Sequence, residues 1–309
     1  MKISVISPVY QAQNIIDELV KKLIIELEKN TNDYEILLVD DGSKDDSWIK
    51  IKENCEANSK VKGIKLSKNF GQHFAIFAGT KNATGDFILI IDCDLQDDPI
   101  YIQNFIKEFN KGYEIIFSRR ISNKQSFFKR LSSIIFNLLI NIFSEEKNDL
   151  KIGSFVGFTK KVLVPFNKFE DKNRQSLQIL KWLGFNSTTI KINHNDRFSG
   201  QSTYSFSKLV DLALQGLINH TDNLLKFIIY LGFFISLISI FSGILIIIRY
   251  LFGYMDIAWT NVIVSIVVAI LFSTGLILAS IGIVGVYIGK IFSQSKKRPL
   301  FIVDKQLNI

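Results

Sequence analysis

The sequence of 309 residues predicts an α/β domain with a mainly parallel sheet, followed by amphipathic helices and two membrane-spanning helices. Two observations support this prediction. Short β-branched runs alternate with helical stretches through residues 1–120, which is the pattern of successive βαβ units. Residues 224–292, in contrast, are almost free of charged side chains. This composition excludes a disordered, collagen-like or disulfide-stapled chain.

The expected strands and helices alternate along the first part of the chain. Strands are expected at 3–7, 35–39, 61–66, 87–91 and 114–117. Helices are expected between them, at 14–29, 46–58, 74–83 and 99–110. Acidic residues gather where two of the strands end, at 40–41 and 92–94. Ligands of open α/β sheets bind at the carboxyl ends of the strands, so we expect the functional site there.

Two amphipathic stretches follow this region. Residues 127–143 place apolar side chains at helical spacing, with Lys129 and Arg130 on the polar side. Such a helix either packs into a core or lies in the membrane interface, where its cations meet lipid phosphates. Residues 205–218 carry a similar stripe and lead directly into the charge-poor region, which favours the interfacial position for them.

Two uncharged segments, 227–248 and 262–288, each reach the length of about 20 residues that a membrane span needs. Lysines flank both outer ends, and basic residues favour the cytoplasmic side. The N-terminus lacks the apolar stretch of a signal peptide. We therefore expect a multi-pass protein of the plasma membrane, with its first domain and both termini in the cytoplasm.

These patterns divide the chain into four parts. They are a cytoplasmic domain at 1–204, an amphipathic helix at 205–223, a two-helix membrane domain at 224–292 and a cytoplasmic tail at 293–309. Glycines on the second span offer close packing surfaces, so we expect a homodimer or homotetramer. The net charge of +8 suits anionic lipids, phosphorylated substrates or nucleic acid. With only two cysteines, a disulfide framework and a cysteine-based zinc site are not expected.

A candidate metal site follows the strand at 87–91. In an extended chain alternate side chains share a side, so Asp92, Asp94 and Gln96 are expected to point together. Two carboxylates and an amide oxygen suit Mg²⁺ or Mn²⁺, with substrate phosphates completing the ligand shell. The alternative is a solvated acidic turn. The position at the end of an apolar strand favours the metal site.

A second acidic turn, Asp40-Asp41-Gly42-Ser43, ends an earlier strand. Its carboxylates are suited to accept hydrogen bonds from a nucleotide base or from ribose hydroxyls. The alternative is a strand-to-helix turn in which Asp or Ser caps the helix.

Several motifs occur together, and the resemblance that they carry extends over nearly the whole chain. They are SVISPVY (4–10), LLVDDGSKDDS (37–47), NFGQ (69–72), IDCDLQDDP (91–99) and RFSGQSTY (197–204). In this combination the chain resembles the family 2 glycosyltransferases with a GT-A fold. Within them it is most similar to the polyisoprenyl-phosphate glycosyltransferases, the group of the dolichol-phosphate mannose synthases and their bacterial relatives.

The resemblance implies an inverting, metal-dependent transfer of one sugar from a nucleotide diphosphate sugar, with UDP favoured, to polyisoprenyl phosphate at a membrane. No nucleic acid partner is implied. The resemblance assigns Mg²⁺ or Mn²⁺ to Asp92, Asp94 and Gln96. It places Pro8, Tyr10, Asp40, Asp41 and Asp92 around the nucleotide. It implies that Asp94, Arg119, Arg130, Ser133 and Arg197 carry the catalysis, the arginines and Ser133 by holding the phosphates. Cations of this kind stabilise a leaving diphosphate.

Three positions depart from the family pattern. Gln11-Ala12-Gln13 replaces the usual Asn-Glu-Glu, which leaves the base preference open. Thr203 replaces a lysine near the phosphates. Ser154 stands where the family commonly has an aspartate that is a proposed general base. A phosphate monoester has a second pKa of about 6 and needs no such base at neutral pH.

Two alternative functions remain open at this point. One is a glycosyltransferase that uses another acceptor, such as the hydroxyl of a glycan or glycolipid. The other is a non-catalytic membrane protein that binds a nucleotide sugar.

Overall fold

The computed structural model describes residues 1–121, 152–170, 175–193, 259–296 and 298–309, and isolated positions between 232 and 252. The chain forms two compact units. The first contains residues 1–127, 149–203 and 298–309, and the second contains residues 128–148 and 204–297.

The first unit is built on an 8-stranded sheet of order β7-β5-β6-β4-β1-β2-β3-β8. The strands are β1 (Ile3–Val9), β2 (Tyr34–Asp40), β3 (Val61–Leu66), β4 (Phe87–Ile90), β5 (Ile115–Ile121), β6 (Ile152–Thr159), β7 (Ser187–Asn193) and β8 (Val303–Leu307). The pairs β1–β2, β1–β4, β2–β3 and β5–β7 are parallel, and the other neighbours are antiparallel. The expected α/β fold with a mostly parallel sheet is therefore confirmed.

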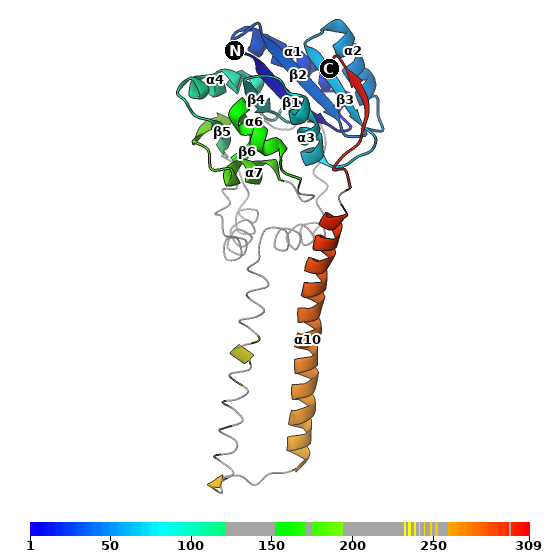
Figure 1. Ribbon diagram of the computed structural model, residues 1–309, viewed down its shortest axis with the longest axis vertical. Coiled ribbons are helices and arrows are strands. Elements are labelled where there is room, and N and C mark those ends of the chain that lie inside the picture. The colour runs from blue at the N-terminus through cyan, green and yellow to red at the C-terminus, as the bar shows by residue number, and fades with distance from the viewer. Residues whose placement is uncertain are drawn as a thin grey trace. The chain divides into compact units, whose positions relative to one another are not determined.

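Helices cover both faces of this sheet (Figure 1). They are α1 (Ile16–Glu28), α2 (Ser47–Ala57), α3 (Gln72–Asn82), the short 3₁₀ helix η1 (Pro99–Tyr101), α4 (Ile102–Asn110), α6 (Lys160–Asn167) and α7 (Ser176–Trp182). Leu19 of α1, Ile51 of α2 and Phe105 of α4 belong to one buried cluster. Phe77 of α3 and Leu180 of α7 belong to the other. Two apolar layers thus hold the strand ends in place.

The C-terminal segment joins the sheet of the first unit. Strand β8 pairs antiparallel with β3, with Lys65 opposite Lys305. Before the strand, Phe301 packs edge-on against Phe77, with ring centroids 6.0 Å apart. The sequence predicts only a tail at 293–309. The strand gives little sequence signal because most of its side chains are exposed, as is usual at a sheet edge.

The described part of the second unit is mainly one long helix. Helix α10 (Trp259–Ser295) has 37 residues, and its stretch Phe272–Gly289 has the length and apolar composition of a membrane span. It is the one such helix among the described residues. Most of the first expected span, 227–248, lies outside the described residues, as do the amphipathic stretches 127–143 and 205–218. The pair of spans stays a prediction.

Candidate active site

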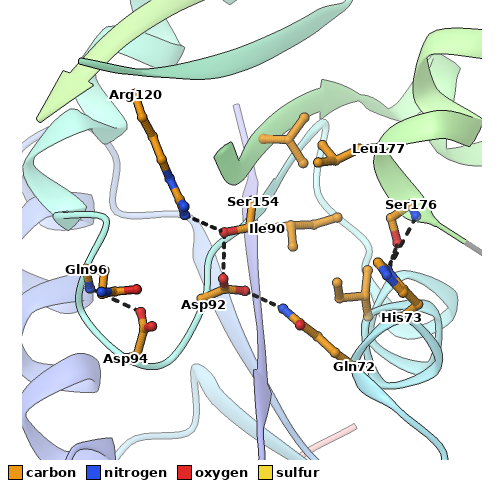
Figure 2. Close-up of a pocket in the computed structure, with 12 residues that line it drawn as sticks. Gln72, His73, Ile90, Asp92, Asp94, Gln96, Arg120, Ser154, Ser176 and Leu177 are labelled. Atoms are coloured by element: carbon orange, nitrogen blue, oxygen red, sulfur yellow. Dashed lines mark hydrogen bonds between the residues drawn. The ribbon is translucent and has the colours of Figure 1, made fainter. Parts of the chain in front are cut away.

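A pocket of about 270 Å³ lies at the carboxyl end of β4. The loop after β4 contributes Asp92, Asp94 and Gln96 to its lining. Other polar lining residues come from three further elements and from β5: Gln72, His73, Arg120, Ser154 and Ser176 (Figure 2). These residues are distant in sequence, and several of them meet because β4 lies beside β6 in the sheet and β6 lies beside β5.

The loop after β4 turns rather than continuing as an extended chain. Leu95 adopts a left-handed backbone with φ of 56°. The backbone N–H of Gln96 donates to Oδ1 of Asp94 over 3.1 Å, which stabilises the turn. The expected alternation of side chains along an extended segment is therefore wrong. Asp92, Asp94 and Gln96 nevertheless line one pocket, as the sequence predicts.

Two donors hold the carboxylate of Asp92. Ser154 Oγ donates to its Oδ2 over 2.5 Å, and Gln72 Nε2 donates to its Oδ1 over 2.6 Å (Figure 2). Burial raises the pKa of Asp92, the hydrogen bond from Ser154 lowers it, and the nearby Asp94 and Asp97 raise it, with a net upward shift. The two hydrogen bonds thus orient the carboxylate of Asp92, while the neighbouring acids place an excess of negative charge around it.

Arg120 extends from β5 toward Asp97 and Ser154. Its Nη2 lies 3.3 Å from Oδ2 of the buried Asp97 and 3.3 Å from Oγ of Ser154. Its Nε is buried and has no hydrogen-bond partner among the described residues. Arg120 therefore places a guanidinium group in the pocket with hydrogen-bonding capacity to spare.

The donor set fits a hard divalent cation that is completed by a substrate. Two carboxylates and an amide oxygen line the pocket, and these are the ligands that Mg²⁺ and Mn²⁺ take. Within the described residues, no group of three or more His, Cys, Asp and Glu side chains forms a complete metal site. Asp94 is the more available carboxylate, because both oxygens of Asp92 already accept hydrogen bonds.

The second acidic turn, after β2, fixes the backbone of the segment that leads into α3. Asp41 accepts hydrogen bonds from the backbone N–H groups of Phe70 and Gly71, each over 2.8 Å. Burial raises the pKa of Asp41, and these two hydrogen bonds only partly oppose the shift. Asp40 accepts from the backbone of Ser43 through Oδ1, while its buried Oδ2 has no partner among the described residues. The turn therefore orders the start of α3 and leaves one acceptor atom unused.

Gly42 is required in this turn for two reasons. Its φ of 66° lies in the left-handed region. A Cβ atom at this position would also lie 2.3 Å from the backbone carbon of Lys68.

The two remaining residues expected at the nucleotide lie at the end of β1. Pro8 belongs to the strand and faces Val39 of β2 in register. Tyr10 follows the strand and is 43% exposed. Their roles stay predictions, as do those of Asp40 and Asp41.

The expected arginines have different outcomes. Arg119 lies on β5, is exposed, and is absent from the described lining of the pocket. Arg130, Ser133 and Arg197 lie outside the described residues, so their roles stay predictions. The neighbouring Arg120 lines the pocket instead. Successive side chains of a strand point to opposite faces, so Arg119 and Arg120 lie on different faces of β5.

Other residues of the pocket were not predicted from the sequence. Gln72 lies in the NFGQ motif, but its contact with Asp92 depends on how α3 packs. His73 lies beside Ser176, whose backbone N–H donates to its Nδ1 over 3.5 Å. Burial lowers the pKa of His73 and so favours the neutral form of its ring. No sequence signal links His73 with Ser176, because they come from different helices.

Comparisons with known proteins agree with this architecture. Residues 4–166 match glycosyl transferase family 2. The chain is 32% identical to the uncharacterized glycosyltransferase YkcC of Bacillus subtilis, over 99% of this chain and 94% of that protein. It is 29% identical to the undecaprenyl-phosphate 4-deoxy-4-formamido-L-arabinose transferase of Salmonella choleraesuis, over 98% of this chain and 93% of that protein.

A solved structure has the same fold. It is glucosyl-3-phosphoglycerate synthase from Mycobacterium tuberculosis in complex with Mn²⁺, uridine diphosphate and phosphoglyceric acid. The two superpose with a TM-score of 0.53 at 13% identity, over 70% of this chain and 76% of that one. At this identity the likeness supports a GT-A-like fold alone. The family match and the full-length relatives together show that this chain belongs to glycosyl transferase family 2.

Proposed function

We propose that this protein moves a single sugar from a nucleotide diphosphate sugar to a polyisoprenyl phosphate, with inversion at the anomeric carbon. One observation carries the proposal. The acids among the described lining residues are Asp92 and Asp94, both in the candidate metal set, and Ser154 stands beside them with Arg120. Such a pocket suits an acceptor that is already ionised when it binds. It offers this acceptor the Arg120 cation beside the Ser154 hydroxyl group, in place of a carboxylate base.

The donor half of the site would use the edge of β1, β2 and β4. Asp94 and Gln96, with Asp92, would hold Mg²⁺ or Mn²⁺, which when bound stabilises the leaving diphosphate. Pro8, Tyr10, Asp40 and Asp41 would surround the nucleotide, for which UDP is favoured. The unused Oδ2 of Asp40 supports this assignment, because a buried acceptor atom without a partner is costly.

The acceptor half would use a phosphate as the nucleophile. One of its oxygens attacks the anomeric carbon, and the bond from that carbon to the donor diphosphate breaks. The electron pair leaves with the nucleoside diphosphate, and no proton has to be removed, because a phosphate monoester is mostly dianionic at neutral pH. A serine in place of a carboxylate base is compatible with this reaction. The undecaprenyl-phosphate transferase among the relatives supports this acceptor class.

The membrane would bring the acceptor to the site. A polyisoprenyl chain stays in the bilayer, so spans at 227–248 and 262–288 would keep the enzyme at the surface where the phosphate lies. The apolar stretch of α10 supports the second of these spans. Arg119, Arg130, Ser133 and Arg197 would bind the phosphates of the two substrates. We place the protein in the plasma membrane as a homodimer or homotetramer, with the first domain and both termini cytoplasmic.

A transfer assay in detergent tests the proposal. Purified full-length protein is incubated with undecaprenyl phosphate and a panel of radiolabelled nucleotide sugars, with Mg²⁺ or Mn²⁺ or with EDTA. We expect label from one donor to enter the organic phase, and EDTA to abolish this transfer. Undecaprenol, which lacks the phosphate, is the matched control acceptor and should receive no label.

Two outcomes would contradict the proposal. Equal labelling of undecaprenol, or labelling of a glycan alone, would identify a hydroxyl acceptor instead. Nucleotide binding without transfer from any donor to any acceptor would identify a non-catalytic binding protein.

A further inference from the structure

Arg120 is the pocket cation that neither the family motifs nor the residues expected around the phosphates include. It lies one residue after Arg119, but its guanidinium group reaches Ser154 and Asp97 at the edge of the pocket (Figure 2). The two contacts share a single nitrogen, Nη2, and both measure 3.3 Å. These distances are long for charge-assisted hydrogen bonds, which measure about 2.7–2.9 Å. Arg120 is therefore held in place but not saturated.

The spare capacity of this guanidinium is partly buried. Nε has no hydrogen-bond partner among the described residues, although it is closed off from solvent. A guanidinium has five N–H donors, and a buried donor without a partner costs free energy. The rest of the group is not closed off, because the Arg120 side chain is 32% exposed and lines the pocket. An anionic group in the pocket could therefore accept from its terminal nitrogens. A neutral hydroxyl would bind there less well, because charge-assisted hydrogen bonds are the stronger ones.

The backbone leaves room for Arg120 at this place. A Cβ atom on Gly153 of β6 would lie 3.0 Å from Nε of Arg120 and 2.6 Å from Oγ of Ser118. A side chain at 153 would therefore displace the arginine. The absence of a side chain at this position lets the stem of Arg120 pass along β6 toward Ser154.

Ser154 links the cation to the reaction centre. Its single hydroxyl proton is donated to Asp92, so its oxygen accepts from Arg120. An anion bound to Arg120 would then lie on the Ser154 side of Asp92. Asp94 and Gln96 belong to the loop at the lower left of Figure 2, below Arg120. The anion subsite would therefore border the candidate metal ligands through Ser154 and Asp92.

We propose that Arg120, held by Ser154 and Asp97, binds the phosphate of the acceptor and so selects a phosphate monoester over a hydroxyl. This inference rests on the proposed function and adds Arg120 to the phosphate-binding residues named above. Arg120 would orient one phosphate oxygen toward the anomeric carbon. It takes no part in proton transfer.

Steady-state kinetics of Arg120→Gln and Arg120→Lys test the inference. The acceptor is varied at saturating donor, and the donor is varied at saturating acceptor. For Arg120→Gln we expect the KM for undecaprenyl phosphate to rise about tenfold or more, the scale of one lost charged hydrogen bond. The KM for the donor should stay within about twofold, and Arg120→Lys should recover part of the loss, because it keeps the charge.

A matched control removes a cation elsewhere. Lys111 follows α4 and pairs with Glu108 at the surface, so Lys111→Gln should leave both KM values unchanged. Decyl phosphate and decanol serve as soluble probes of the acceptor subsite. Decyl phosphate should compete with undecaprenyl phosphate in the wild type, and its inhibition constant should rise in both Arg120 variants. Decanol should show neither effect. The lysine variant keeps this test valid if Arg120→Gln does not fold.

These experiments distinguish a failure of the proposed function from a failure of the role given to Arg120. A wild-type protein that does not label undecaprenyl phosphate overturns the proposed function itself. If the wild type is active, unchanged acceptor KM and unchanged inhibition by decyl phosphate in both variants would overturn the role of Arg120. A rise confined to the donor KM would overturn it too, because Arg120 would then bind the donor diphosphate.

Discussion

Two carboxylates, the buried Glu35 and the half-buried Asp92, lie at opposite ends of the parallel strands and have opposite electrostatic environments. Glu35, near the amino end of β2, is 2% exposed. It accepts hydrogen bonds from Ser4 Oγ over 2.5 Å and from the backbone of Thr84 over 2.7 Å, and it pairs with Lys62 over 2.8 Å. Burial raises the pKa of Glu35, but these contacts outweigh it and lower the pKa to about 2.

Asp92, beyond the carboxyl end of β4, also accepts a serine hydroxyl over 2.5 Å. Its pKa nevertheless shifts upward, because burial and the charges of Asp94 and Asp97 outweigh that hydrogen bond and the charge of Arg120. The difference lies in the neighbours. The charge of Glu35 is balanced within the protein, whereas acids gather around Asp92. An excess of this kind is typical of a site that takes its balancing cation from a ligand.

The largest effect is expected for Asp94→Asn. This change removes one negative charge from the candidate metal set but keeps its shape. We expect sugar transfer to fall roughly a hundredfold to a thousandfold, as for the loss of an electrostatic group that acts on the transition state. The melting temperature should not fall, since Asp94 balances no buried cation. Initial rates of label transfer measure the effect.

The matched control for Asp94→Asn is Glu53→Gln, which removes an exposed carboxylate on α2. It should keep wild-type activity. Retention of more than a tenth of the activity by Asp94→Asn would contradict the assignment of Asp94.

The next effect concerns stability. Glu35→Gln leaves Lys62 without its buried partner. The downward pKa shift of Glu35 from 4.5 to about 2 corresponds to about 3 kcal/mol of folding free energy at neutral pH. We expect a loss of this size in the unfolding of the first unit, measured by denaturant titration of the full chain in detergent. Sugar transfer per folded molecule should not change.

The pH dependence checks the origin of this stability. Glu35 has a lower pKa in the folded state, so its contribution is complete above about pH 4.5 and is lost as the pH falls toward 2. The gap between wild type and Glu35→Gln should therefore narrow below pH 4.5. A gap that stays constant down to pH 2 would show that packing, rather than the charge of Glu35, supplies the stability.

The smallest effects come from a matched pair of serines. Ser4→Ala removes a donor to Glu35 and also the acceptor of the Gly85 N–H, so it should cost about 1–2 kcal/mol of stability without changing turnover. Ser154→Ala releases Asp92 and Arg120 and should lower turnover about tenfold, the scale of about 1.4 kcal/mol. Unfolding titrations and kcat of both variants measure this. Equal effects of the two changes on kcat would contradict the contrast between the two carboxylates.

Much of the fold could be predicted from local sequence patterns. The first four expected strands and the intervening helices are present within a few residues of their expected bounds. Strand β5 runs on to Ile121, beyond the expected end at 117, because its last residues pair with β7. Strand β8 gave almost no signal, since an exposed edge strand has no regular apolar alternation.

The candidate site was predictable in part. Asp92, Asp94 and Gln96 could be placed together because they lie close in sequence and follow a buried strand. Arg120 could not be chosen over Arg119, because the two are adjacent on β5 and the face of β5 that borders the pocket is set by how the sheet packs. The contacts of Asp92 with Gln72 and Ser154 also depend on elements far apart in the chain.

The sequence by itself determined the alternation of strands and helices, the acidic edge of the sheet and the charge-poor region, because each of these depends on neighbours along the chain. Only the tertiary structure decided which donors hold Asp92, which arginine enters the pocket and where the C-terminal strand pairs. The physical reason is that long-range hydrogen bonds and strand register follow from packing, and no local pattern of residues records that packing.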